Sequence, residues 1–356
     1  MFRRATVDDA PAILEVIEAA FDEWPSFEIP VSRLEHLQWK MQPPVGVEPA
    51  HTLGEMDGRV MSVELRWLSN CYVNGEVWLG NVGADKSIRP EYQGRGFNRA
   101  LNTAEVRLPQ PGRIGIETPS RNARILATRG DEGRANRALR VWGRPLGLRQ
   151  AGRVVRVAGL ARLGRVLGAL LGVAAPTRRP PAGTQIAVID RFDERADALW
   201  DRARAAFDVA TVRDARYLNW RHADPRAGRT LILGAFDGTS GSDGALLAYA
   251  AFRRSGDHAS LVDVLADPAR RVVLGPLIAE GAARMRAVGC SMITGWPPPG
   301  HSDAPALEAA GFLDLGTSLP LELDTPPGQE PDEVQVARFE DTSLRVHVTL
   351  GDFDFA

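Results

Sequence analysis

The sequence contains an internal repeat, and this repeat constrains the fold more than any other feature. Residues 3–21 and 187–207 each read as a short strand followed by an amphipathic helix that ends in Ala-Ala-Phe. Further landmarks keep an almost constant spacing: Trp39 with Trp220 at 181 residues, Pro90 with Pro268 at 178 and Pro119 with Pro297 at 178. Such spacing is typical of a duplicated unit. The sequence therefore predicts two α+β domains, residues 1–146 and 184–356, joined by residues 147–183.

Composition favours a folded two-domain protein over other classes of chain. With 356 residues, of which 44% are hydrophobic and 25% charged, the chain has enough apolar side chains for two cores, which excludes a disordered protein. A net charge of −2 argues against a nonspecific nucleic-acid binder, so no DNA partner is expected. No apolar run reaches the roughly 20 residues of a membrane span, and no secretory leader is recognisable. Because Cys71 and Cys290 form neither a metal nor a disulfide pattern, a cytoplasmic protein is expected.

An arginine-rich segment without acidic residues lies between the two predicted domains. Residues 133–189 contain eleven arginines and no Asp or Glu, and apolar residues recur in the segment at helical spacing. The simplest interpretation is a linker helix that packs on both domains. Two alternatives stay open, namely an anion-facing wall for a phosphorylated cofactor and an RNA or membrane surface.

A hairpin and a glycine-containing turn follow each other in the first repeat. Residues 60–72 and 76–88 read as strands on either side of an Asn-Gly dipeptide, which favours a type I′ turn because both central residues need positive φ. After the second strand, Gly94 and Gly96 precede an amphipathic helix. A strand, a glycine turn and a helix start direct backbone N–H groups and the positive end of a helix dipole at one spot. The arrangement predicts a pyrophosphate site.

The same loop carries a family resemblance. Residues 88–101 resemble the acetyl-CoA loop of the GNAT (general N-acetyltransferase) superfamily, whose pattern is Gln/Arg-x-x-Gly-x-Gly/Ala. Gln93 and Gly96 match this pattern, whereas Asn98 stands where the family has Gly or Ala. The order of elements extends the resemblance over residues 3–145, and the repeat extends it to the second half. The resemblance implies two tandem GNAT-like domains, each with a mixed, mostly antiparallel sheet flanked by helices, of which the second is degenerate.

The resemblance also implies which residues bind acetyl-CoA or another acyl-CoA. Backbone amides of the loop hold the diphosphate, and the main chain near Ile88 pairs with the pantetheine like an added strand. Asn122 is similar to an Asn of the family that reaches the pantetheine. The expected cofactor-binding residues are therefore Ile88, Gln93, Gly94, Arg95, Gly96, Phe97, Asn98 and Asn122.

The second repeat lacks the glycines of this loop. At the spacing of 178 residues, Val272 stands where Gly94 stands and Leu274 stands where Gly96 stands. Branched side chains at these positions are expected to block a diphosphate. The second domain is therefore expected to shape the acceptor pocket or a dimer surface instead of binding CoA.

Three carboxylates are candidates for the catalytic base, because an attacking amine must lose a proton. If the Asn-Gly turn sets the register of the hairpin, Glu64 lies opposite Asp85, and two neighbouring carboxylates raise the pKa of one of them. Glu117 ends the next strand, at the edge where ligands bind to open sheets. For each of the three, a purely structural role on a solvated strand face or at a helix cap is the alternative.

The sequence thus predicts an enzyme, an N-acyltransferase and most simply an N-acetyltransferase, in which a primary amine of a small molecule attacks acyl-CoA directly. Two alternatives stay open. One is a non-catalytic acyl-CoA sensor or scaffold, favoured by Asn98, and the other is a Fem-type transferase that depends on aminoacyl-tRNA, favoured by the arginine-rich segment. The six histidines show no metal-ligand spacing, so acyl-CoA is expected without a metal. A homodimer is left open.

Overall fold

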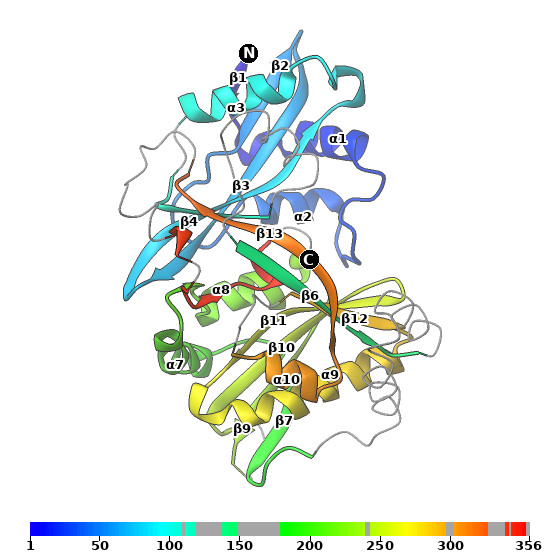
Figure 1. Ribbon diagram of the computed structural model, residues 1–356. Helices are drawn as coiled ribbons and strands as arrows, with labels where there is room; N and C mark the ends of the chain where they lie inside the picture. The colour runs from blue at the N-terminus through cyan, green and yellow to red at the C-terminus, as the bar shows by residue number, and fades with distance from the viewer. Residues whose placement is uncertain are drawn as a thin grey trace. The chain divides into compact units, whose positions relative to one another are not determined.

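The structure is a computed structural model that divides into two units (Figure 1). The described residues are 1–108, 111–118, 137–147, 179–238, 243–296, 302–326, 339–341 and 343–353. Unit 1 comprises Met1–Arg137, Pro225–Ala227 and Pro320–Leu344, and unit 2 comprises Ala138–Asp224, Gly228–Leu319 and Arg345–Ala356. Pro119, Asn122, Pro297 and most of the predicted linker lie outside the described residues.

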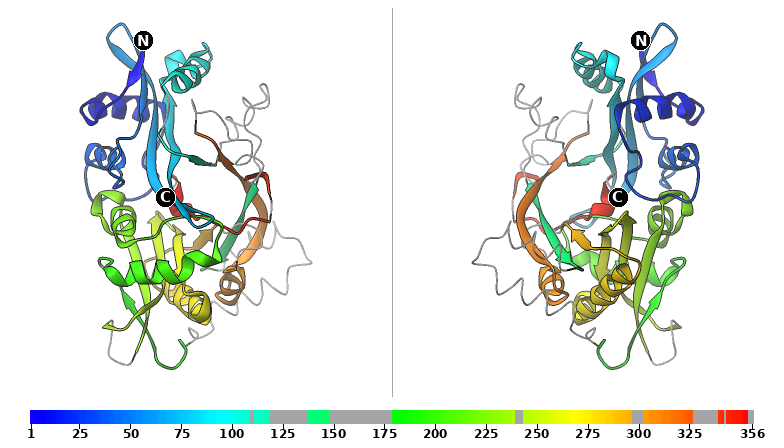
Figure 2. Two further views of the ribbon diagram at one scale, coloured as in Figure 1. Left: turned by 90° about the vertical axis from the view of Figure 1, so that its left-hand side faces the viewer. Right: turned by 90° about the vertical axis from the view of Figure 1, so that its right-hand side faces the viewer.

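Unit 1 is a sheet with helices on both faces. Its elements are β1 (Phe2–Arg4), η1 (Val7–Asp9), α1 (Ala10–Ala20), α2 (Arg33–Lys40), β2 (Thr52–Met56), β3 (Arg59–Val73), β4 (Glu76–Ile88), η2 (Pro90–Tyr92), α3 (Phe97–Arg107) and β5 (Ile114–Glu117), with η6 (Pro225–Ala227) from later in the chain. Strands β1 to β4 pair antiparallel in sequence order, and β5 pairs parallel with β4. Helices α1 and α2 lie on one face of this sheet and α3 lies on the other (Figure 2).

Local sequence explains how these helices begin and which side they bury. The N-cap Ser32 accepts a hydrogen bond from the Glu35 N–H, and the Glu35 carboxylate accepts one from the Ser32 N–H, so this capping box starts α2. In α1, the buried residues Ile13, Val16 and Ile17 recur at helical spacing and pack in one core cluster with apolar residues of β2 and β3.

Unit 2 repeats this order of elements. It contains β6 (Arg137–Pro145), β7 (Thr184–Val188), α7 (Glu194–Ala203), η4 (Arg204–Ala206), β8 (Val209–Thr211), α8 (Ala215–Leu218), the π-helical turn η5 (Asn219–Ala223), β9 (Thr230–Asp237), β10 (Leu246–Ser255), β11 (His258–Ala266), η8 (Pro268–Val273), α9 (Leu274–Ala287), β12 (Met292–Gly295), α10 (Ala304–Ala309), β14 (Val346–His347) and η9 (Leu350–Asp352). As in unit 1, a hairpin (β10–β11) precedes a 3-10 helix and a long helix, and the next strand pairs parallel with the second hairpin strand. A core around Phe252, Leu277 and Ile278 joins α9 to this sheet.

In each sheet, the strand that pairs parallel with its neighbour (β5 in unit 1, β12 in unit 2) also pairs with a strand from a distant part of the chain. In unit 1, the end of β13 (Leu313–Asp324) pairs antiparallel with β5, at Glu322–Glu117, Leu323–Ile116 and Asp324–Gly115. In unit 2, β6 pairs antiparallel with β12. Both units therefore complete the same sheet pattern, but each does so with a strand that lies far away in sequence.

Candidate active site

The predicted phosphate loop of unit 1 is built as a glycine turn that leads into a helix. Strand β4 ends at Ile88, whose carbonyl oxygen accepts a hydrogen bond of 3.0 Å from the side chain of Gln93. Gly94 and Gly96 have φ values of 73° and 84°, a conformation that favours glycine, and α3 begins at Phe97 directly after Gly96. The Gln93 side chain therefore holds the turn against the end of β4.

The backbone amides of this turn are available to a ligand. Within the part of the chain that the structure describes, the N–H groups of residues 94–99 donate no hydrogen bond, and the first helical bond of the turn runs from Ala100 N–H to Gly96 O. Gly96 is the N-cap of α3 and provides no side-chain cap. A Cβ placed on Gly94 or Gly96 would meet no atom within 4 Å, so the space over the turn is open. Such a helix N-terminus suits a phosphate group.

A buried network centred on Arg66 lies on the face of the unit 1 sheet that α3 covers. The Arg66 guanidinium donates to Glu64 at 2.5 Å, to Glu105 of α3 at 3.1 Å and to Glu117 of β5 at 2.7 Å. Lys86 donates to Glu64 and lies 3.4 Å from Glu105. The side chain of Arg66 reaches Glu117 across Gly83, where a Cβ would lie 3.0 Å from the Glu117 carboxylate.

The two buried carboxyl groups of this network differ in proton affinity. Burial by itself raises the pKa of Glu64, but the positive charges of Arg66 and Lys86 outweigh burial and lower this pKa to about 2. Burial and the negative charge of Glu64 raise the pKa of Glu105 to about 7, against the opposing effect of the two cations. Glu64 is therefore a weak base that stays ionised, and Glu105 holds a proton around neutral pH.

The expectation that Glu64 and Asp85 lie side by side was wrong. A β-bulge interrupts the register between Val63 and Leu65, where Asp85 adopts a φ of 46°. The Asp85 carboxylate accepts a hydrogen bond from Trp24 Nε1 at 2.9 Å and lies 2.5 Å from Lys40 Nζ, partners that belong to the α1 and α2 side of the sheet. No pair of adjacent carboxylates forms between Glu64 and Asp85.

Glu117 lies where β4 and β5 separate. These strands pair only at Gly80–Ile114 and Asn81–Gly115, two pairs before the end of β5. The side chain of Glu117 is 32% exposed, in contrast to 6% for Glu64, so Glu117 is the more accessible of these two carboxylates. The structure brings two of the three candidate bases, Glu64 and Glu117, into one network. The residues that link them, Arg66 and Glu105, were not singled out from the sequence.

Sequence reasoning also missed the acidic residues of β13. Glu322 pairs with Glu117 across the strands, and Asp324 pairs with Gly115. Burial, followed by the negative charges of Glu117 and Glu322, raises the pKa of Asp324 to about 8. One signal for these residues is present in the sequence, since Glu322 and Asp324 alternate with the buried Leu321 and Leu323 along one strand.

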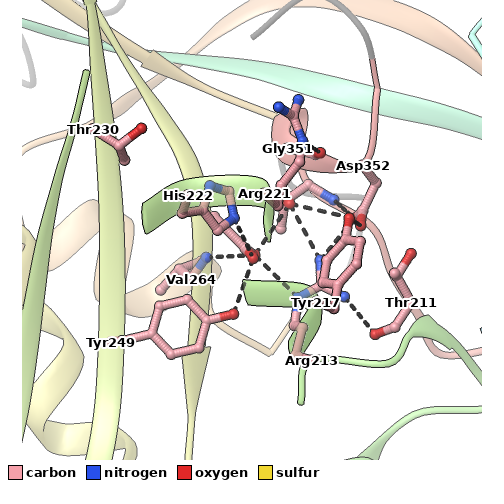
Figure 3. A network of polar contacts seen from close by, with 12 residues as sticks. Thr211, Arg213, Tyr217, Arg221, His222, Thr230, Tyr249, Val264, Gly351 and Asp352 are labelled. Carbon is pink, nitrogen blue, oxygen red and sulfur yellow. Dashed lines mark hydrogen bonds and ion pairs between the residues drawn. The ribbon is translucent and has the colours of Figure 1, made fainter. Parts of the chain in front are cut away.

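The residue of unit 2 that corresponds to Asp85 lies in a buried network of polar contacts (Figure 3). Asp263 of β11, 178 residues after Asp85, accepts hydrogen bonds from Arg213 at 3.0 Å and from Tyr249 at 2.9 Å, and its other neighbour is His222 at 3.1 Å. Burial lowers the pKa of His222 to about 4, because it outweighs the effect of the Asp263 carboxylate. His222 is therefore neutral and held in place.

The loop after β11 in unit 2 offers no comparable amides. Here Asp267 caps η8, and the N–H groups of Arg270 and Leu274 donate to the carbonyls of Asp267 and Arg271. Leu274 is fully buried in the core, so its side chain does not cover the loop as the sequence analysis expected, whereas Val272 is 69% exposed. Helical hydrogen bonds, rather than two branched side chains, occupy the backbone at this position.

Comparisons with known proteins show the fold. No protein-family model matches the sequence, and a search of curated proteins found no match. Among solved structures, a probable N-acyltransferase from Enterococcus faecalis V583 matches 92% of this chain and 73% of its own, with a TM-score of 0.60 and 10% identity. A tandem GNAT protein from the clavulanic acid biosynthesis pathway matches 93% of this chain and 99% of its own, with a TM-score of 0.58 and 13% identity. The chain has a tandem GNAT fold.

A third structure extends this likeness. Saccharomyces cerevisiae N-myristoyltransferase with bound myristoyl-CoA matches 93% of this chain and 82% of its own, with a TM-score of 0.59 and 11% identity. These matches confirm the predicted α+β class and its two GNAT-like domains. Among the described residues, no helix is long and apolar enough to cross a membrane, and no group of three His, Cys, Asp or Glu side chains is arranged to hold a metal ion.

Proposed function

We propose that the chain is an N-acyltransferase that uses acyl-CoA, most simply acetyl-CoA, and acylates a primary amine of a small molecule by direct attack. The observation that carries this proposal is the turn of unit 1, with its unpartnered amides at residues 94–99 and its two glycines at positive φ. The tandem GNAT fold supports it, as do the names of two neighbours, a probable N-acyltransferase and an N-myristoyltransferase with bound myristoyl-CoA.

In this proposal, the amides of Gly94, Arg95, Gly96, Phe97 and Asn98 bind the CoA diphosphate at the N-terminus of α3. The positive end of the helix dipole and several N–H donors then act on the same phosphate groups. The pantetheine runs from there along the end of β4 near Ile88, toward the point where β4 and β5 separate. The thioester thereby comes close to the carboxyl groups at the end of β5.

Binding of acetyl-CoA to a Gly96→Ala variant tests this proposal. The added methyl group lies over the amides and disfavours the φ of 84°, so we expect affinity measured by calorimetry to fall about tenfold or more. Gly58→Ala is the matched control, because Gly58 has a φ of 74°, lies in the turn between β2 and β3 and also has nothing within 4 Å of an added Cβ. We expect both variants to lose similar stability and only Gly96→Ala to lose affinity.

Two results would contradict the proposal in different ways. If the wild-type protein binds neither acetyl-CoA nor a longer acyl-CoA, the loop is not a diphosphate site. If it binds acyl-CoA but releases no CoA thiol with any primary amine in a panel, the non-catalytic sensor replaces the enzyme.

A further inference from the structure

We propose that the acceptor enters unit 1 as an ammonium group bound among Glu117, Glu322 and Asp324, and that the Asp324 carboxylate takes its proton. This inference rests on the proposed function, and it adds the charge of the acceptor and the identity of the base. Asp324 is not one of the three carboxylates that the sequence suggests as candidate bases, because it belongs to β13, a strand that lies far from β5 in the sequence.

The position of Asp324 is the first observation that supports the inference. Asp324 pairs with Gly115, and the pairing of β4 with β5 stops at this same glycine. A Cβ placed on Gly115 would lie 1.9 Å from Asp324 Oδ1, so the carboxyl group occupies the space that any other residue at position 115 would fill. The absence of a side chain at Gly115 thus lets Asp324 lie over the strand next to the point of separation.

The second observation is that the carboxyl groups of Glu117 and Asp324 differ in their hydrogen-bond partners. Glu117 has Arg66 as its partner at 2.7 Å, but the carboxyl group of Asp324 makes no hydrogen bond to the side chains of the described residues and interacts with Arg66 through charge alone. Arg66 already donates to Glu64 and Glu105 as well, so a single guanidinium serves several carboxyl groups. A half-buried carboxylate that faces two other carboxylates is unfavourable unless a cation binds it, and an ammonium group supplies both hydrogen-bond donors and positive charge.

Acyl transfer to the bound amine consists of a proton transfer, formation of a C–N bond and cleavage of the C–S bond. The bound ammonium group gives one proton to the Asp324 carboxylate, which passes it to water, and the free nitrogen lone pair forms a C–N bond with the thioester carbonyl carbon. When the adduct collapses, the C–S bond breaks, its electron pair goes to sulfur, and the second proton of the nitrogen ends on the CoA thiolate. The products are the N-acyl amine, CoA thiol and one proton.

The proton affinity of Asp324 suits this task. The pKa of Asp324 is raised to about 8 by burial and by the facing carboxylates Glu117 and Glu322, with Arg66 acting in the opposite direction. Glu64 of β3, Glu105 of α3 and Lys86 of β4 are the further titratable groups around Arg66. A base transfers protons best when its pKa lies close to the working pH, and its ionised form increases as the pH rises from 7 to 9.

Acyl transfer to butylamine by an Asp324→Asn variant tests the inference, with release of CoA thiol as the readout. We expect kcat to fall about 100-fold or more and the rise of the wild-type rate between pH 7 and 9 to disappear, while calorimetric affinity for acetyl-CoA stays unchanged. The matched control is Asp22→Asn, an exposed residue of unit 1 outside the cluster, for which we expect the wild-type rate and pH profile.

The charge of the acceptor gives a second measurement, which needs only the wild-type protein. Butylamine and β-alanine are primary amines of similar length, but β-alanine carries a carboxylate that the cluster repels. We expect kcat/KM to be roughly tenfold or more higher for butylamine, and Glu322→Gln to raise the KM for butylamine more than it lowers kcat.

The outcomes separate this inference from the proposed function. Turnover by the wild-type protein together with an unchanged rate and pH profile in Asp324→Asn overturns the inference and leaves the acyltransferase standing. If Asp324→Asn does not fold, the wild-type protein alone tests the inference. A wild-type rate that does not rise between pH 7 and 9 then overturns the inference, and so does an equal kcat/KM for butylamine and β-alanine. Loss of turnover and of CoA binding in the wild-type protein overturns the proposed function itself.

Discussion

At the scale of single residues, unit 1 places three carboxyl groups, those of Glu64, Glu105 and Glu117, around the two cations Arg66 and Lys86. Arg66 and Lys86 donate hydrogen bonds to both Glu64 and Glu105, and the contacts of Glu105, at 3.1 Å and 3.4 Å, are longer than those of Glu64. Glu105 therefore carries the proton that the cluster needs, and its ionisation works against the folded state.

We predict that this ionisation makes unit 1 less stable as the pH rises. The pKa of Glu105 is about 7 in the folded state and 4.5 in the unfolded state, so the folded state retains the proton between these values. The stability that Glu105 contributes is complete below pH 4.5 and is lost as the pH passes through 7, by about 3 kcal/mol. In urea unfolding from pH 5 to 8, Glu105→Gln should make the decrease smaller by about 3 kcal/mol, whereas the decrease due to Asp324, whose pKa is raised to about 8, should remain.

The exposed residue Glu18 of α1 provides the control, because its ion pair with Arg33 is on the surface and contributes little. The Glu18→Gln variant should keep the wild-type decrease. A decrease of equal size in wild-type and Glu105→Gln proteins would show that Glu105 does not bind the extra proton.

At the scale of elements, the predictions that succeeded rest on local chemistry. The hairpin of β3 and β4 turns at Asn74 and Gly75, with φ values of 47° and 98°, because few other residue pairs accept this conformation. The bulge at Asp85 leaves no such mark in the sequence, since one extra residue changes the side on which a side chain points without changing composition.

The pairing partner of β13 could not be read from the sequence for a different reason. Alternation of apolar and acidic residues in 321–324 indicates a strand, but it says nothing about which strand lies beside it. Glu322 and Glu117 are paired although 205 residues separate them in sequence. For this reason the glycine turn before α3 could be predicted from its local pattern, whereas the position of Asp324 beside Gly115 could not.

The C-terminal segment supplies hydrogen-bond partners to two buried arginines of unit 2. Arg213 donates to Asp352 at 2.7 Å, and Arg221 donates to the carbonyl oxygens of Gly351 and Phe353 at 2.6 and 2.8 Å. Both arginines are at most 1% exposed, so removing their partners leaves two buried guanidinium groups with fewer partners.

We predict that ending the chain after Leu344 prevents unit 2 from folding. Circular dichroism should show loss of ordered structure, and limited proteolysis should cut within residues 184–296. Asp208→Asn is the control, because it removes the charge of the ion pair with the exposed Arg345 side chain while an amide oxygen can still accept from the Arg345 N–H, so the melting temperature should be nearly unchanged. A shortened protein that melts like the full chain would contradict this role for the segment.

At the scale of the whole molecule, the two units share an order of elements but differ in the segment that follows the second strand of the hairpin. In unit 1 a glycine turn leaves the amides of residues 94–99 unpartnered, and in unit 2 a 3-10 helix runs directly into α9. In unit 2, Asp263, which corresponds to Asp85, belongs to a buried network with Arg213 and His222. We therefore assign acyl-CoA binding to unit 1 alone, as part of the proposed function.

Amide hydrogen exchange with and without acetyl-CoA tests this assignment most directly, because it measures the proposed hydrogen-bond donors themselves. We predict that acetyl-CoA slows exchange at residues 94–99, where the amides gain phosphate partners, and leaves exchange at residues 268–274 unchanged. Unchanged exchange at residues 94–99 in the presence of saturating acetyl-CoA, or slowing at residues 268–274 instead, would contradict it.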